Sequence, residues 1–182
     1  MSKKLDIHQW VHTLPLQGKR ALVRLFSYRD LSENYISWLN DPEVVRYSNQ
    51  RFLTHDMDSV NRYFKHFVDS SNIFLAIEDA QNAQHVGTMT IYVQPYHYTS
   101  DIGILVGEHG KGYGAEAWCL VVDWLLNTCH VRKVTAGTLA CNRGMLRLME
   151  ESGMKREAIR RDQELVEGKP QDVIYFAKFH AI

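Results

Sequence analysis

The sequence predicts one α+β domain around a mostly antiparallel sheet, and three observations lead to this fold class. Short apolar segments typical of strands are interspersed with segments of helical periodicity along the chain. Two of the helical segments come early, among strands that suit an antiparallel sheet. At 182 residues, without an internal repeat or a low-complexity tract, the chain is long enough for one domain with a sizeable core.

The strands are predicted from apolar alternation and from the turn residues that bound them. They follow an expected N-terminal extension, residues 1–18, whose short amphipathic segment ends at Pro15; residues 19–182 form the predicted domain. Residues 167–170 contain Gly and Pro and predict the turn of a closing hairpin. The expected strands are residues 21–26, 73–78, 86–93, 101–106, 133–138, 155–162 and 172–179.

The helices are predicted from capping residues and from apolar faces. Ser32 caps a helix that runs to Leu39 and stops before Pro42. The next helices are expected at residues 56–68, at residues 113–126 and after Asn142. The segment 113–126 is apolar nearly all round, which predicts a buried helix.

Composition excludes several classes of function. Lys+Arg and Asp+Glu both number 21, so no basic surface predicts a nucleic acid or a membrane as partner. No apolar run approaches the ~20 residues of a membrane span, and the first residues lack the apolar stretch of a signal peptide. Cys119, Cys129 and Cys141 are an odd number without metal-ligand spacing. We therefore expect free thiols, no metal and a cytoplasmic location.

The most informative segment is residues 101–118, which predicts a strand, a glycine-rich loop and the first turn of a helix. Gly110, Gly112 and Gly114 lack a Cβ, so an anionic ligand can lie directly on their backbone. The following helix points its unpaired N–H groups and the positive end of its dipole at the same place. The segment therefore predicts a cradle for a phosphate or pyrophosphate.

Two common phosphate loops do not fit this segment. A Walker loop needs Ser or Thr after the lysine, whereas Lys111 is followed by Gly112. A dinucleotide fold needs a different glycine spacing early in a βαβ unit. The run His109-Gly-Lys-Gly-Tyr-Gly114 instead resembles motif A of the GNAT superfamily of acetyl-CoA-dependent N-acetyltransferases, with His109 where Arg or Gln is usual.

The resemblance extends over about residues 18 to 179. Residues 142–154 resemble the family's Asn-to-Gly-Phe block, and residues 35–44 resemble the RimJ/RimL-like branch. Together with Arg46 and Tyr47, which follow it, the segment 35–44 resembles acetyltransferases that act on nucleotide-linked amino sugars. The resemblance implies the GNAT fold, with a twisted sheet that is splayed between its fourth and fifth strands and flanked by helices.

The same resemblance implies that acetyl-CoA is the acetyl donor. Its pantetheine arm would lie along the strand before the glycine loop, and its pyrophosphate would lie on the loop amides. Asn142 would contact the cofactor, cap its helix or do both. The implied cofactor-binding residues are Ile104, Leu105, Val106, His109, Gly110, Lys111, Gly112, Tyr113, Gly114 and Asn142.

Two residues are candidates for the general base. His97 precedes the strand that leads to the loop, and a histidine can take up a proton near neutral pH. Asp101 is the second candidate, as a direct base or through a water. The general acid is missing from its usual places, because Met149 stands at the family's Tyr position and Met145 at the branch's Ser position.

Acceptor recognition is expected from residues 40–54 and 92–99, where aromatic and arginine side chains gather. The expected acceptor-binding residues are Arg46, Tyr47, Arg51, Tyr92 and Tyr96. They suit the first hypothesis, a nucleotide-activated amino sugar of surface polysaccharide biosynthesis, because arginines bind phosphate and aromatic rings stack on sugars and bases. The alternatives are a protein N-terminus or polyamine as acceptor, and a non-catalytic acyl-CoA-binding module. A homodimer is the default expectation.

Overall fold

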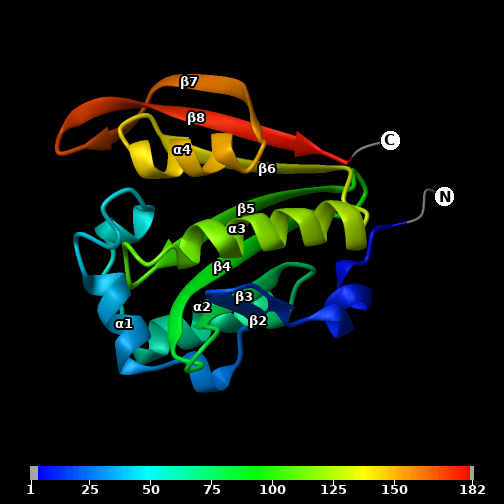
Figure 1. Cartoon of the computed structure of the whole chain (residues 1–182). Coiled ribbons are helices and arrows are strands. Elements are labelled where there is room, and N and C mark those ends of the chain that lie inside the picture. Colours follow the sequence, from blue (N-terminus) through cyan, green and yellow to red (C-terminus); the bar gives the residue numbers. More distant parts are fainter. Residues whose placement is uncertain (1–3, 181–182) are drawn as a thin grey trace.

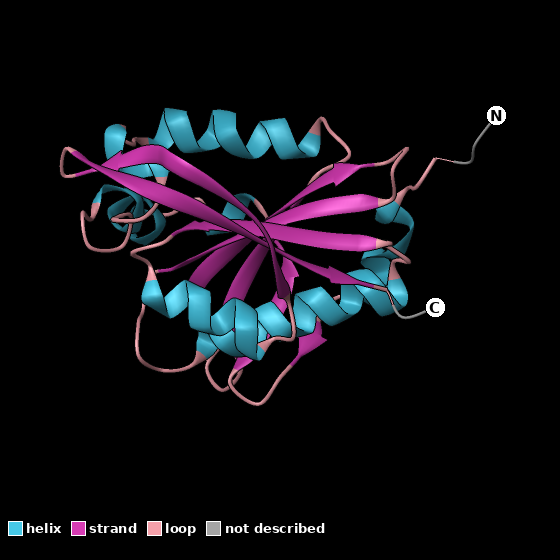
Figure 2. Ribbon diagram, turned by 90° about the horizontal axis from the view of Figure 1, so that it is seen from above, coloured by secondary structure: helices cyan, strands magenta, loops and turns pink. Residues whose placement is uncertain are grey.

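The computed structural model describes residues 4–180, which form one twisted sheet with helices on both faces (Figures 1 and 2). The strand order is β1-β2-β3-β4-β5-β6-β8-β7, and every neighbouring pair is antiparallel except β5 and β6. This confirms the predicted fold class. The strands are β1 (Leu16–Gln17), β2 (Ala21–Leu25), β3 (Ile73–Asp79), β4 (His85–Gln94), β5 (Thr99–Val106), β6 (Lys133–Leu139), β7 (Lys155–Val166) and β8 (Lys169–Phe179).

The helices begin at the capping residues that the sequence indicates. The Ser32 hydroxyl accepts a hydrogen bond from the Tyr35 N–H (3.2 Å), and Asn142 Oδ1 accepts one from the Met145 N–H (3.2 Å). The helices are α1 (Glu33–Asn40), α2 (Met57–Val68), α3 (Tyr113–Asp123) and α4 (Arg143–Glu151). Short 3-10 turns add η1 (Ile7–Thr13), η2 (Tyr28–Asp30) and η3 (Asn49–Phe52).

Each face of the sheet has its own apolar core. On one face, α3 and α4 cover the larger core, and the Trp118 side chain at its centre is fully buried. On the other face, α1 and α2 cover a smaller aromatic core that includes Trp38, Phe64 and Phe74. Burying each such side chain contributes about 1.5–3 kcal/mol to folding. The helices thereby hold the sheet between two layers and cover its faces. The ends of the strands stay accessible to ligands.

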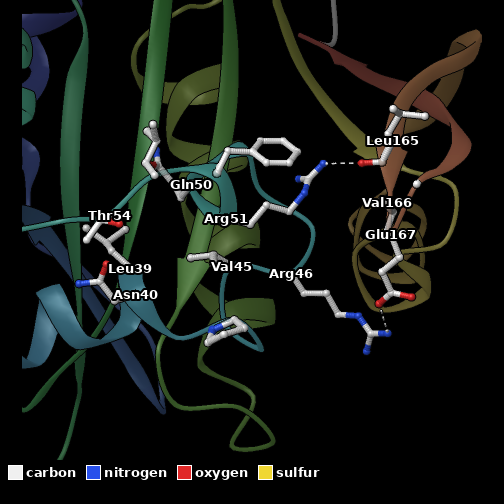
Figure 3. Close-up of a pocket in the computed structure, with 14 residues that line it drawn as sticks. Leu39, Asn40, Val45, Arg46, Gln50, Arg51, Thr54, Leu165, Val166 and Glu167 are labelled. Carbon is white, nitrogen blue, oxygen red and sulfur yellow. Dashed lines mark hydrogen bonds and ion pairs between the residues drawn. The ribbon is translucent and has the colours of Figure 1, made fainter.

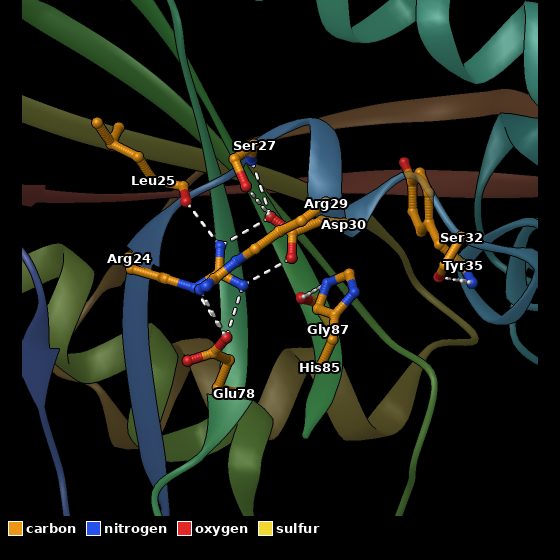
Figure 4. Close-up of polar contacts among 10 residues, drawn as sticks. All are labelled: Arg24, Leu25, Ser27, Arg29, Asp30, Ser32, Tyr35, Glu78, His85 and Gly87. Atoms are coloured by element: carbon orange, nitrogen blue, oxygen red, sulfur yellow. Dashed lines mark hydrogen bonds and ion pairs between the residues drawn. The ribbon is translucent and has the colours of Figure 1, made fainter. Parts of the chain in front are cut away.

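A polar cluster closes the α1 side of the sheet (Figure 4). The Arg24 guanidinium donates to both oxygens of Asp30 (2.7 and 2.6 Å) and to Oε1 of Glu78. Asp30 also accepts from the Ser27 N–H (2.8 Å). Burial alone would raise the pKa of Asp30, but these hydrogen bonds outweigh burial and hold its pKa below the ordinary value. The cluster therefore fixes the chain where it turns from β2 toward α1.

The structure departs from the expected elements in three places. The closing hairpin turns at Glu167 and Gly168 alone, both with positive φ, so its strands are longer than predicted. The helix from Tyr113 ends at Asp123 and continues as a π-helical turn, η4 (Trp124–Thr128). The described part of the N-terminal extension packs on the main core, where Leu5 and Ile7 are buried.

The sheet opens between β5 and β6, the fourth and fifth predicted strands. The two strands pair in parallel only through Thr99, Ser100 and Asp101, opposite residues 133–135. Beyond Asp101 the structure records no further pairing between them, although both strands continue for several residues. The predicted splay is thus confirmed, and Asp101 lies at its vertex.

Candidate active site

A cleft of about 580 Å³ occupies the opening between β5 and β6. Ile102–Val106 of β5 form one wall, and Gly137 and Thr138 of β6 form the other. The start of α4 adds Asn142, Gly144, Met145 and Leu148 to the lining. Because β5 has no strand partner on its β6 side here, its backbone groups on that side can pair with an extended ligand. The cleft runs from the vertex at Asp101 toward the glycine loop.

The glycine loop at the far end of the cleft has the geometry of an anion cradle. Gly112 is the N-cap of α3 and has φ +80°, and Gly110 has φ +82°. A Cβ on Gly112 would lie 2.6 Å from Arg20 Nη1, whereas one on Gly110 would meet nothing within 4 Å. The left-handed backbone favours glycine at both positions. The free N–H groups of the first turn of α3 then face an open space that suits a phosphate.

Side chains from other elements hold this loop in place. The Glu116 carboxylate accepts hydrogen bonds from the N–H groups of Lys19 (3.0 Å), Arg20 (2.7 Å) and Ala21 (2.7 Å). Burial alone would raise the pKa of Glu116, but the hydrogen bonds from these three backbone N–H groups outweigh burial and lower the pKa below its ordinary value. Glu116 thus has a structural role at the base of α3. It also keeps Arg20, which sequence analysis missed, beside Gly112.

Asn142 lines the cleft and caps α4 at the same time. Its Nδ2 donates to the Thr138 hydroxyl (3.1 Å), while its Oδ1 accepts from the Met145 N–H. The cap confirms one of the two roles expected from the sequence. His109 also lines the cleft, and Lys111 is turned away to Glu108 (2.7 Å). The Tyr113 hydroxyl donates to Asp79 rather than facing the cleft.

Asp101 lies where the cleft meets a second, smaller cavity of about 190 Å³. Its Oδ2 accepts a hydrogen bond from the Thr135 hydroxyl (2.7 Å) on β6. Although Asp101 is partly exposed, burial of its carboxylate raises its pKa above the ordinary value and outweighs the hydrogen bond from Thr135, which lowers it. A carboxylate of raised pKa, next to a cleft, has the properties of a general base.

The structure does not bring the other base candidate into the cleft. His97 lies exposed in the turn between β4 and β5, at the end of β5 opposite the glycine loop. Its backbone carbonyl accepts from Arg132 (3.3 Å), and its N–H donates to the Gln94 carbonyl. Tyr96 shares this exposed turn, next to Lys4. Tyr92 is opposite Asp101 in the β4–β5 register, and its hydroxyl is 3.2 Å from that of Tyr63.

The two expected acceptor arginines line a separate pocket of about 790 Å³ between η3 and the β7–β8 hairpin (Figure 3). Arg51 is mostly buried, donates to the Ser48 and Leu165 carbonyls (2.7 and 3.2 Å) and lies 3.5 Å from Glu164. Arg46 lies 3.7 Å from Glu167. Both guanidinium groups are therefore already partnered by the hairpin. Glu164 and Glu167 were missed, since no local motif links the hairpin to residues 46–51.

Comparison with known protein families shows which family the chain belongs to. The sequence model of the acetyltransferase (GNAT) domain matches residues 20–155, which is most of the chain. The chain belongs to the GNAT acetyltransferase family. As a GNAT acetyltransferase it uses acetyl-CoA, and the glycine loop with its neighbouring cleft has the shape and the free backbone donors that this donor requires.

Individual relatives are distant in sequence but close in fold. A Bacillus subtilis (strain 168) protein named "Probable N-acetyltransferase YjcK" is 23% identical over 167 residues, 86% of this chain and 92% of that protein. A GNAT-family acetyltransferase structure from Bacillus anthracis has a TM-score of 0.79 at 19% identity and covers 92% of this chain and 99% of its own. Spermidine N-acetyltransferase from Vibrio cholerae, solved with CoA and spermine, has a TM-score of 0.80 at 18% identity and covers 90% and 97%.

Across residues 4–180, no three or more His, Cys, Asp or Glu side chains are grouped in a way that could hold a metal ion. Over the same residues, no helix has both the length and the apolar character that a membrane crossing requires.

Proposed function

We propose that this GNAT enzyme acetylates a primary amine that reaches the vertex of the splayed sheet, with Asp101 as the proton acceptor. The observation that carries the proposal is the position of Asp101, at the junction of the donor cleft and the 190 Å³ cavity. That junction is where a donor in the cleft and an acceptor in the cavity can meet. His97, the other candidate, is at the closed end of the sheet.

The chain's residues would divide the work in a simple way. The backbone of Ile104–Val106 and the amides of the glycine loop would hold the donor, and Asn142 would border it. Acetyl-CoA supplies an already activated acyl group, so the protein has mainly to position the reactants and move protons. Asp101 would take the proton that the amine loses as its nitrogen attacks. Thr135 would keep the Asp101 carboxylate oriented through its hydrogen bond.

The charge of the cavity favours a small cationic amine, such as a polyamine, as acceptor. Its described lining includes two carboxylates, Asp101 and Glu164, and no Lys, Arg or His. The rings of Tyr47 and Tyr175 are also part of this lining, and aromatic faces attract ammonium groups. Glu164 is paired with Arg51 (3.5 Å), so the Asp101 carboxylate and the two rings would select for positive charge.

The second candidate is the nucleotide-linked amino sugar expected from the sequence. The adjoining 790 Å³ pocket supports it by its size and by its apolar lining, which includes Phe52 and Leu53. Against it, Arg46 and Arg51 already have carboxylate partners, so their charge is not free for a diphosphate. A homodimer and a cytoplasmic location stay predictions.

An assay of CoA thiol release tests the proposal. Purified chain with acetyl-CoA is given spermidine, spermine, an N-terminal peptide and a nucleoside-diphosphate-linked amino sugar. We expect turnover with the polyamines at the highest kcat/KM. A higher kcat/KM for the nucleotide sugar would favour the second candidate. Tight binding of acetyl-CoA without release in any mixture would favour a non-catalytic acyl-CoA-binding module.

A further inference from the structure

The reaction needs a proton donor as well as an acceptor, and α4 offers none at the cleft. Met145 and Leu148 face the cleft from α4, while Met149 is fully buried in the core. A thioether cannot give up a proton, so the departing sulfur takes its proton from a side chain of another element, from solvent or from the new ammonium group. The donor has to lie near the transfer point, where the donor cleft meets the Asp101 cavity.

Three residues line both of these spaces: Tyr47, Gly137 and Thr138. Gly137 has no side chain. Thr138 is 8% exposed, and its hydroxyl, which accepts a hydrogen bond from Asn142 Nδ2, is aliphatic and far less acidic than a phenol. Tyr47 is 37% exposed, and within the described residues its hydroxyl has no hydrogen-bond partner. Tyr47 is therefore the shared residue with a free acidic proton.

The position of Tyr47 is set by the segment between α1 and η3. The neighbouring Ser48 N–H donates to the Val45 carbonyl (2.8 Å), and buried Val45 anchors that turn. The Arg46 guanidinium lies over the Tyr47 ring, 5.6 Å from its centroid. These contacts leave the ring at the mouth of the splay, opposite β6.

We propose that Tyr47 is the general acid that protonates the CoA sulfur. The amine first loses its extra proton to solvent. Its nitrogen then forms a bond to the acetyl carbonyl carbon and passes one proton to Asp101, while the carbon–sulfur bond breaks with both electrons on sulfur. The Tyr47 hydroxyl gives its proton to that sulfur, and the products are the amide and the CoA thiol. Solvent then removes the proton from Asp101 and returns one to Tyr47, which restores both residues.

This assignment rests on the proposed function and is tested with Tyr47→Phe, which removes only the hydroxyl. We expect kcat for the best amine to fall at least ~10-fold. The KM of that amine and the calorimetric Kd of acetyl-CoA should stay within about twofold, because no binding contact is removed. The matched control is Tyr28→Phe on η2, an exposed tyrosine far from the cleft, and it should keep the wild-type kcat.

A second measurement separates a proton donor from a positioning residue. Difluorotyrosine at position 47 keeps the ring and the hydroxyl but loses its proton more readily. It should move the alkaline fall of kcat to lower pH, and Tyr47→Phe should abolish that fall. A Tyr47→Phe chain with kcat within twofold of the wild type, or an alkaline fall that difluorotyrosine does not move, overturns the assignment. Absence of turnover in the wild-type chain refutes the proposed function itself.

Discussion

The donor and acceptor sides of the transfer point differ in the groups that face the ligand, which are mainly backbone on the donor side and side chains on the acceptor side. The donor side consists largely of backbone, with glycines in left-handed conformation, the first turn of α3 and a stretch of β5 that is unpaired on its β6 side. The acceptor side consists of side chains such as Asp101, Tyr47 and Glu164, which come from three separate parts of the chain. The donor side therefore has few points at which one substitution can abolish binding. On the acceptor side, single side-chain substitutions should lower kcat directly.

The largest expected effect is the loss of acetyl-CoA binding in Gly112→Asp. The new carboxylate would bring negative charge to the anion cradle, and its Cβ would approach Arg20. Acetyl-CoA at 100 times its Kd should stabilise the wild type by about 2.7 kcal/mol and so raise its melting temperature. The melting temperature of the variant should not change. Gly153→Asp is the matched control, since Gly153 has a similar φ of +82° away from the loop. An equal ligand-induced shift in both variants would contradict the backbone cradle.

Asp101→Asn tests the acceptor side. We expect kcat to fall by about 10²–10⁴, with the Kd of acetyl-CoA unchanged, because the amide cannot take a proton. The wild-type kcat should fall as the pH drops through the raised pKa of Asp101, at higher pH than for an ordinary aspartate. The raised pKa also means that ionised Asp101 destabilises the fold above that pKa. The variant should therefore melt slightly higher at neutral pH, and this difference should vanish in acid.

Asp30→Asn sharpens the contrast between a catalytic and a structural carboxylate. The substitution leaves Arg24 without its bidentate partner in a buried cluster, which should cost about 3–5 kcal/mol of stability at neutral pH. The pKa of Asp30 is lowered, so its stabilisation is present above the ordinary aspartate pKa and is lost as the pH falls through the lowered value. Urea denaturation at two pH values measures this loss. A folded variant with wild-type stability would show that the cluster is dispensable.

His97→Ala should have the smallest effect of the set. The side chain is exposed in the β4–β5 turn and lines none of the cavities described above. We expect kcat to change by less than about twofold at every pH, because an exposed side chain outside the site rarely matters by more. A ten-fold loss of kcat with an altered pH profile would instead make His97 the base and leave Asp101 as a positioning residue.

Sequence analysis predicted the donor side better than the acceptor side for a physical reason. The strand, glycine loop and helix cap are contiguous, so residues 101–118 contain most of the information that specifies them. The Asp101 cavity joins β5 to the β7–β8 hairpin, and nothing in either segment indicates that Glu164 lies near Asp101. His97 was a candidate because it precedes the strand that leads to the loop and can take up a proton near neutral pH, but antiparallel pairing of β4 and β5 places it at the closed end.

The ends of the strands also could not be predicted fully from local sequence. The first strand of the closing hairpin was expected to end at Asp162, yet β7 continues through a register shift between Arg160 and Glu164 to Val166. Asp162 adopts a φ of +47° within this irregularity. A bulge of this kind depends on the partner strand, so one-strand periodicity cannot predict it. Its consequence is functional, because the extended β7 is what delivers Glu164 to the cavity.

A crystal structure with acetyl-CoA and an unreactive acceptor analogue tests the central claim most directly. We predict the pantetheine arm between β5 and β6 and the thioester beside the vertex of the splay. The analogue's nitrogen position should lie within hydrogen-bond reach of Asp101, about 2.6–3.2 Å. A donor bound outside the opening between β5 and β6, or an acceptor nitrogen beside His97, would contradict the account.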